Sequence, residues 1–293
     1  MTAAVALKRS AASPSTSLVE GEFPFSQEDF AQIAAMLYED SGIYLTEGKV
    51  TLVYSRLAKR VRTLGLASFR DYCELVSSQA GADERGTMLS ALTTNLTRFF
   101  REPHHFDHFR DNTLPALTEH ARGGGRVRFW SAGCSSGEEP YSMALALLSV
   151  LPEAAELDVR ILATDIDPII VGRAREGVYN EEAVSAIPQE LRRNWLKREG
   201  DGSWRMGEAV RRLIAFNELN LMGQWPMKGR FEAIFCRNVA IYFDEPTQER
   251  LWGRFAGQLA PEGRLYIGHS ERIGVTGFET DGLTTYKLAG ARR

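Results

Sequence analysis

The stretch at residues 128–141 constrains the fold of this chain more than any other. Strand-forming residues ending at Trp130 are followed by small residues at 131–137, and a helical pattern then begins at Glu138. This order is typical of the first turn of a nucleotide-type α/β site. There, glycines admit a ligand to the backbone and the helix N-terminus offers unpaired N–H groups. We therefore predict an α/β fold with a ligand site at this loop.

Two carboxylates, Glu138 and Glu139, stand at the mouth of the loop. They would repel a pyrophosphate and suit a cationic or hydroxyl-rich ligand, such as the sulfonium, amine and ribose of S-adenosylmethionine. The alternative is a well-capped helix, because acidic residues are favoured in the first helical turn in any case. A GxGxxG fingerprint is absent from the sequence, which argues against NAD or FAD.

A second acidic position follows the next predicted strand, at residues 159–164. An acidic residue at this place typically accepts hydrogen bonds from ribose hydroxyls, which makes Asp165 a candidate ligand of the cofactor. Asp167 directly precedes Pro168, where a helix N-cap is expected, so we interpret Asp167 as a cap.

The third buried strand pattern, at residues 231–236, is followed by Arg237 and Asn238. They would lie at the carboxyl end of the strand, where open α/β sheets bind their ligands. Arginine is almost never buried without a partner, which favours a functional role for Arg237. Tyr242 follows on the same loop and would either line the reacting cleft or belong to the core. A later strand ends in a polar cluster that includes Glu271.

Length and composition fit an enzyme with more than one domain. The chain has 293 residues, of which 44% are hydrophobic and 25% charged, as in ordinary globular proteins. A net charge of −3 gives no bulk attraction to nucleic acid or to an anionic membrane. No apolar run approaches a membrane span, and no secretory signal is evident. Cys73, Cys134 and Cys236 are odd in number and far apart, so we expect no disulfide or zinc site and a reducing cytoplasm.

The periodicity of the sequence divides the chain into four parts. Residues 1–22 lack periodicity and are predicted to be a disordered tail. Residues 23–92 show only helical patterns, opened by a capping box at Ser26, and predict a small helical domain. Residues 93–121 form a linker and a helix. In residues 122–293 strand-like and helical runs alternate, which predicts a doubly wound, mostly parallel sheet.

One long interruption of this alternation precedes the strand at residues 231–236. Residues 203–206 and 210–216 within it look like short strands separated by glycine turns. We predict a small antiparallel β insert at about residues 198–217, with either a functional or a merely stabilising role.

Four stretches together resemble the chemotaxis receptor glutamate O-methyltransferases of the CheR type. They are residues 93–102, 133–142, 163–167 and 235–244, and residues 268–271 match as well. The resemblance covers roughly residues 23–290, and its motifs are much more specific than a single glycine loop. The sequence of the first loop departs slightly from the usual family motif, with Gly133 and Cys134 at positions where other small residues can stand.

The resemblance implies a helical N-terminal domain and an S-adenosylmethionine-binding α/β domain with a small β insert. It implies methyl transfer from S-adenosylmethionine to glutamate side chains of chemotaxis receptors in sensory adaptation, giving glutamate methyl esters and S-adenosylhomocysteine. Arg101 and Tyr242 would be catalytic, with Tyr242 beside the reacting centre. The implied cofactor contacts are Asn95, Thr97, Arg101, Glu139, Asp165, Asn220, Leu221, Arg237 and Asn238.

This chemistry asks for no general base. A glutamate side chain, with an ordinary pKa of about 4.3, is already an anionic nucleophile at neutral pH. The cofactor activates the methyl group itself, so the protein must align the reactants and exclude water. Arg101 would anchor the carboxylate of the cofactor or of the substrate, or form an interdomain ion pair. No metal is expected, although Glu102 with His104, His105 and His108 resembles a metal cluster, and we interpret these as solvent or interface histidines.

Two other functions remain as alternatives. A nucleic-acid methyltransferase using S-adenosylmethionine would bring a basic surface and usually an Asn/Asp-Pro-Pro-aromatic loop, which residues 236–239 replace here. A cofactor-binding chemotaxis module without turnover is the non-enzymatic alternative, and the intact acidic, Asn and Tyr positions argue against it.

A basic helix face is the candidate docking surface for the receptor. On the predicted helix at residues 49–64 the stripe of Val50, Val53, Leu57 and Val61 would face the core. The opposite face would carry Arg56, Lys59 and Arg62. It would dock the helical, carboxylate-bearing cytoplasmic domain of a receptor, or be merely solvated. The β insert is a second candidate dock, for a receptor C-terminal peptide, although Arg211 and Arg212 at its predicted edge argue against it. We expect no binding of nucleic acid and no direct membrane insertion.

Overall fold

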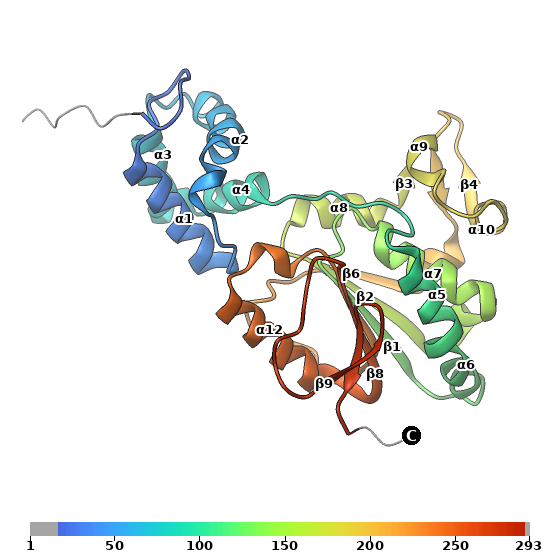
Figure 1. The fold of residues 1–293 in the computed structure, drawn as a ribbon. Coiled ribbons are helices and arrows are strands. Elements are labelled where there is room, and N and C mark those ends of the chain that lie inside the picture. Colours follow the sequence, from blue (N-terminus) through green and yellow to red (C-terminus); the bar gives the residue numbers. More distant parts are fainter. Residues whose placement is uncertain (1–16, 291–293) are drawn as a thin grey trace, which may run out of the picture. The chain divides into compact units, whose positions relative to one another are not determined.

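The computed structural model describes residues 17–290, and these form two compact units (Figure 1). Unit 1 comprises residues 17–36 and Leu45–Leu92, and unit 2 comprises Leu37–Tyr44 and residues 93–290. Residues 1–16 of the predicted disordered tail lie outside the described residues. No helix within residues 17–290 has the length and apolar character needed to cross a membrane.

Unit 1 is helical, as the periodicity predicts. Its helices are α1 (Gln27–Ser41, whose last turn belongs to unit 2), η1 (Glu47–Lys49), α2 (Val50–Thr63), α3 (Phe69–Ser77), η2 (Gln79–Gly81) and α4 (Ala82–Leu92). The predicted capping box is confirmed, because the Ser26 N–H donates to Asp29 Oδ2 at 2.9 Å and the Asp29 N–H donates to Ser26 Oγ at 3.2 Å. The predicted core stripe of α2 is confirmed for Val53, Leu57 and Val61, which are fully buried.

Unit 2 contains a seven-stranded sheet in the order β6-β2-β1-β7-β8-β10-β9. The five strands from β6 to β8 are parallel, and β10 and β9 are antiparallel. This confirms the predicted mostly parallel sheet. The strands are β1 (Val127–Ala132), β2 (Val159–Asp165), β6 (Ile214–Glu218), β7 (Phe231–Cys236), β8 (Leu259–Ile267), β9 (Phe278–Gly282) and β10 (Thr285–Leu288).

Helices connect these strands and cover both faces of the sheet (Figure 1). Phe129 of β1 belongs to one apolar core together with α7 (Glu138–Val150), whereas Trp130 belongs to a second core together with α12 (Glu245–Gln258). Successive strand residues point to opposite faces, so β1 is buried on both sides. The helical segments are α5 (Pro103–His108), η3 (Phe109–Thr113), α6 (Leu114–Arg122), α7 (Glu138–Val150), η4 (Ala154–Glu156), α8 (Pro168–Glu176), α9 (Glu181–Val184), α10 (Gln189–Trp195), α11 (Glu208–Arg212), η5 (Ala240–Tyr242) and α12 (Glu245–Gln258).

The antiparallel insert exists, but its strands differ from those predicted. It consists of β3 (Val178–Tyr179), β5 (Trp204–Met206) and β4 (Leu196–Arg198), in that order. The prediction of an insert strand at residues 210–216 is wrong, because α11 covers its first part and β6 pairs in parallel with β2 in the main sheet. Val210 and Leu213 are both fully buried. Their spacing of three is that of one helix face, which the strand interpretation overlooked.

Candidate active site

The loop after β1 is shaped by main-chain contacts with the end of β2. The N–H groups of Gly133 and Cys134 both donate to the carbonyl of Thr164 at 2.8 Å. Gly133 has φ 84°, and a Cβ atom there would lie 2.4 Å from Cγ2 of Val239. Glycine therefore permits both this backbone conformation and the close approach of the loop that follows β7.

Asp165 ends β2 and is almost fully buried, with 8% of its surface exposed. Its two oxygens accept main-chain N–H groups, from Ser135 at 2.8 Å and from Asp167 at 3.1 Å. Burial raises the pKa of Asp165, and these N–H groups oppose that rise. No cationic side chain in residues 17–290 forms an ion pair with it. A buried carboxylate with remaining lone pairs suits a ligand that donates hydroxyl groups.

Two further residues at this loop behave as the sequence predicts. Asp167 is the N-cap of α8 and accepts the Ile169 N–H at 3.0 Å, which confirms its predicted role. Asn95 donates to Asp167 Oδ2 at 3.1 Å, and its carbonyl accepts a hydrogen bond from Ser135 Oγ at 3.1 Å. The segment around Asn95 therefore reaches the same end of the sheet as Asp165.

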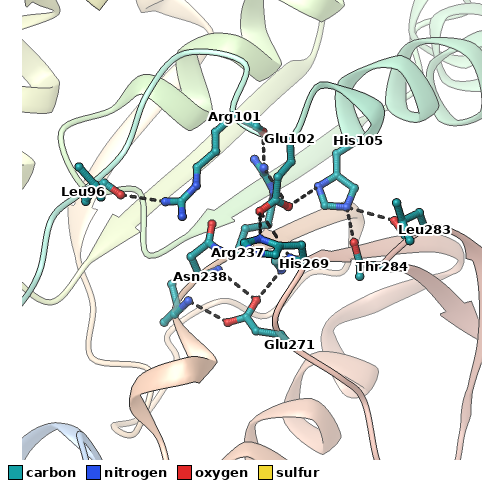
Figure 2. Close-up of polar contacts among 12 residues, drawn as sticks. Leu96, Arg101, Glu102, His105, Arg237, Asn238, His269, Glu271, Leu283 and Thr284 are labelled. Atoms are coloured by element: carbon teal, nitrogen blue, oxygen red, sulfur yellow. Dashed lines mark hydrogen bonds and ion pairs between the residues drawn. The ribbon is translucent and has the colours of Figure 1, made fainter.

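Arg237 lies at the centre of a buried ionic cluster (Figure 2). Its side chain is 2% exposed and forms ion pairs with Glu139 at 3.2 Å and with Glu102 at 3.3 Å. It also donates to the carbonyl of Arg101 and lies 5.4 Å from the ring centroid of Phe106. The predicted need of Arg237 for a partner is thus met within the protein.

Both carboxylates of the cluster have further partners. Glu139 Oε1 accepts from Ser131 Oγ at 2.7 Å, and burial raises the pKa of Glu139 against the opposing effect of Arg237. Burial also raises the pKa of Glu102. The hydrogen bond with His269 at 2.9 Å and the charge of Arg237 outweigh burial and lower this pKa to about 2. The sequence shows Glu102 beside Arg101 but gives no sign that it pairs with Arg237, because that contact is tertiary.

Three predicted residues keep uncommitted polar groups. Arg101 is half-buried, and its guanidinium makes one contact within residues 17–290, a hydrogen bond to the Leu96 carbonyl at 2.9 Å. The hydroxyls of Tyr242 and Thr97 have no hydrogen-bond partner in this described part of the chain, and both residues are half-buried. These groups are therefore available to a ligand.

Asn220 and Leu221 follow β6 and contribute mainly to structure. Asn220 Oδ1 accepts the Met222 N–H at 2.8 Å, and its amide donates to the Asp40 carbonyl. Leu221 is 7% exposed and packs in the same core as Trp130. Asn238 adopts a left-handed conformation with φ 60°, directly after Arg237.

The histidines near Arg101 differ from the prediction of solvent or interface positions. His105 is fully buried and contacts Thr284 Oγ1 at 2.8 Å, while His108 is half-buried and contacts Tyr266 Oη at 3.1 Å. Glu102, His104 and His105 each place one ligand atom within 4.8 Å of the others. The Arg237 guanidinium already pairs with the same Glu102 carboxylate, which opposes a second cation there. The absence of a metal stays a prediction.

Glu271 is a site residue whose role the sequence does not reveal. It is 3% exposed, and its carboxylate accepts the N–H groups of Asn238, Val239 and Ala240 at 3.0, 2.9 and 2.7 Å. The sequence signals for Glu271 are its place in the polar cluster after β8 and the match of residues 268–271 to the CheR-type motifs, and neither says what its carboxylate contacts.

Comparison with known proteins identifies the family. Residues 95–286 match the family description of the CheR methyltransferase S-adenosylmethionine-binding domain, and residues 28–93 match that of the CheR all-alpha domain. The chain belongs to the CheR methyltransferase family. It is 56% identical to a probable chemotaxis protein methyltransferase of Rhizobium etli, over 86% of this chain and 96% of the relative. It is 42% identical to chemotaxis protein methyltransferase 2 of Pseudomonas aeruginosa (89% and 92% covered) and 40% identical to the Escherichia coli chemotaxis protein methyltransferase (90% and 92% covered).

The CheR chain is therefore an S-adenosylmethionine-dependent methyltransferase of chemotaxis. The nucleic-acid methyltransferase and the module without turnover are disfavoured by the same matches. The structure brings Asn95, Glu139, Asp165, Arg237 and Asn238 to one end of the sheet through the contacts described above. Their individual contacts with the cofactor, and those of Thr97, Arg101, Asn220 and Leu221, stay predictions.

Proposed function

We propose that the methyl acceptor is the side-chain carboxylate of glutamate residues in the helical cytoplasmic domain of a chemotaxis receptor. The observation that carries this proposal is the difference between two neighbouring arginines. Arg237 is saturated by two carboxylates and a carbonyl, whereas Arg101 has one hydrogen bond to a carbonyl and no carboxylate partner in residues 17–290. Arg101 thus keeps donors for an incoming carboxylate.

The residues at the ends of β1, β2 and β7 would hold the cofactor. When bound, S-adenosylmethionine supplies a methyl group that its sulfonium has already activated. Asp165 would accept hydrogen bonds from ribose hydroxyls, and Glu139, Asn95, Thr97 and the segments around Asn220, Leu221 and Asn238 would complete the cradle. The fit is supported by Asp165, a buried carboxylate without an ion-pair partner in the described chain.

The reacting groups would be oriented rather than activated by the protein. Arg101 would hold the acceptor carboxylate, and Tyr242 would line the cleft with its uncommitted hydroxyl. An ionised glutamate needs no general base at neutral pH. We therefore expect no essential group with a pKa near the histidine value of about 6.5 in the pH–rate profile.

The product tests this proposal directly. Receptor-containing membranes and RNA are incubated in parallel with tritiated S-adenosylmethionine and the protein. We expect label on the receptor that is released as methanol by mild alkali, as a glutamyl methyl ester requires. Arg101→Ala should lower this transfer strongly while the protein remains folded, and Arg98→Ala, an exposed arginine three residues earlier, serves as its control. Label that survives alkali, or label on RNA, would contradict the proposal.

Docking of the receptor on the basic face of α2 belongs to the same proposal. Lys59 is exposed, and Arg62 is exposed and paired with Glu22. Arg56 donates to the carbonyls of Ala91 and Leu92 at 3.2 and 2.9 Å. Lys59 and Arg62 would therefore make the main contacts with receptor carboxylates, while Arg56 contributes charge from a fixed position.

The β insert is the proposed second dock, for an extended C-terminal peptide of the receptor. Its outer strands β3 and β4 each pair on one side only, with β5, so a peptide strand could add to either edge. Arg211 and Arg212 lie on α11 rather than on this edge, which removes the objection based on them. The test is a fluorescence titration with a labelled C-terminal peptide of the receptor. Absence of binding in this titration would rule this dock out.

A further inference from the structure

One buried carboxylate, that of Glu271, is surrounded by main-chain donors from two segments. Four consecutive N–H groups starting at Asn238 and one from the end of β8 point at it, and no ion pair with a cationic side chain exists within residues 17–290. The donors are Asn238 at 3.0 Å, Val239 at 2.9 Å, Ala240 at 2.7 Å, Ile241 at 3.3 Å, and Gly268. Successive N–H groups that converge on one point form a nest, which ordinarily binds an anion.

The packing around this nest leaves little freedom. Asn238 holds a left-handed conformation, with φ 60°, which asparagine adopts more readily than most non-glycine residues. A Cβ atom on Gly268 would lie 2.8 Å from the Asn238 nitrogen and 2.9 Å from Glu271 Oε2. Figure 2 shows Glu271 directly beneath Asn238, next to the Arg237 cluster. The carboxylate and the glycine together define the course of the chain after β7.

The segment held in this way contains residues already assigned to the site. It begins directly after Arg237, includes Asn238, and continues through η5 to Tyr242. Arg237 itself is fixed independently by Glu102 and Glu139, whereas the Tyr242 hydroxyl has no hydrogen-bond partner in the described residues. The Tyr242 carbonyl accepts the Tyr44 N–H at 2.8 Å, and Glu271 is the side chain that binds the N–H groups of the four residues before Tyr242.

We propose that Glu271 is a positioning residue whose carboxylate fills the nest and thereby sets the place of Tyr242 beside the reacting groups. Because the nest is already occupied, it cannot capture the acceptor carboxylate, which is left to Arg101. This inference rests on the proposed role of Tyr242, and it assigns Glu271 no contact with substrate or cofactor.

The test uses two variants of the 293-residue chain and a control. Glu271→Gln keeps the shape but places an amide N–H₂ against the N–H groups, and Glu271→Ala empties the nest. A misplacement of about 1 Å lowers a rate on the order of 100-fold, so we expect kcat for receptor methylation to fall by about that factor. S-adenosylhomocysteine affinity should fall less than kcat, since Asp165 and Glu139 keep their own partners and Asn238 is the proposed cofactor contact whose N–H Glu271 binds. Val171→Ala, a core substitution on α8, should lower stability without this loss of kcat.

Two readouts separate positioning from mere stability. Amide hydrogen exchange at residues 238–241 should accelerate in both Glu271 variants and not in Val171→Ala. Formate or acetate should enter the nest of Glu271→Ala and restore both protection and part of kcat, with no effect on the control. A folded Glu271→Gln protein with wild-type kcat would overturn the proposal, as would a Glu271→Ala protein that small carboxylates do not rescue. If the wild type makes no alkali-labile product, the proposed function fails, whereas the exchange and rescue data still decide the role of Glu271.

Discussion

Arg62, on α2 of unit 1, and Arg237, in unit 2, occupy opposite environments. Arg62 is 58% exposed as a side chain and pairs with Glu22, which is itself 50% exposed. Arg237 is 2% exposed and pairs with two carboxylates that are 11% and 10% exposed. Both regions carry arginine–carboxylate pairs, yet water solvates the first pair and is excluded from the second.

This difference matches the two tasks that we propose for the two regions, receptor docking and catalysis. An exposed pair contributes little to stability and exchanges partners easily, which suits reversible docking to a receptor. A buried cluster is held by charge and hydrogen bonds together, and removing one member leaves an uncompensated buried charge. Such a cluster suits a site whose geometry must persist from one turnover to the next.

The largest effect is expected on removing Arg237. Arg237→Leu leaves Glu102 and Glu139 buried without their cation, so the free energy of unfolding should fall by about 3–5 kcal/mol. Arg62→Leu, its exposed counterpart, should leave stability unchanged within error. Urea denaturation of both variants measures this contrast. Equal stabilities would break the distinction between the two regions.

The next effect concerns the cofactor. Asp165→Ala should weaken binding of S-adenosylmethionine by about 10- to 100-fold, because it loses charge-assisted hydrogen bonds worth about 1.5–3 kcal/mol. Asp165→Asn, which keeps one acceptor for the Ser135 or Asp167 N–H, separates loss of charge from disruption of the loops. Calorimetry on the folded variants gives the affinities. Unchanged affinity in both would remove Asp165 from the cofactor site.

A third effect, spread over several pH units, is expected on the pH dependence of stability. Burial and the charge of Arg237 lower the pKa of His105 to about 3. Unfolded His105 binds a proton near pH 6.5, so between about pH 6.5 and 3 the unfolded state holds more protons. Stability should therefore fall as the pH drops through this window, by up to about 1.4 kcal/mol per pH unit. His105→Gln should flatten this slope in urea titrations at about pH 5 to 7, and an unchanged slope would show that His105 is not its source.

Local patterns in the sequence predict much of this molecule, and tertiary contacts explain what they miss. β1, β2 and β7 and the Ser26 and Asp167 caps follow from periodicity and capping rules, which act within a few residues. The insert is mispredicted because β6 is recruited by β2, a partner about fifty residues earlier in the chain.

Prediction of the site residues from local sequence patterns has the same limit. Asp165 and Arg237 can be found because both stand directly at strand ends. Glu102 and Glu271 contact partners more than thirty residues away along the chain, and no spacing rule reaches that far. The prediction of a solvent or interface position for His105 is wrong because helical spacing alone does not say which face of a short helix packs against the core.

Charge reversal on α2 tests most directly the central claim, that unit 1 docks the receptor while unit 2 binds the cofactor. The variant combines Arg56→Glu, Lys59→Glu and Arg62→Glu. The control variant has the same change of net charge, because Arg70, Arg122 and Arg173 are reversed to Glu instead. A second α2 variant retains Arg56, because that side chain donates to the carbonyls of Ala91 and Leu92 and its loss could alter the structure of unit 1. The measurement is receptor methylation at low and moderate salt, together with calorimetric S-adenosylhomocysteine affinity. We predict that the α2 variant loses methylation and keeps its affinity, whereas normal methylation by the folded protein at both salt concentrations would contradict the account.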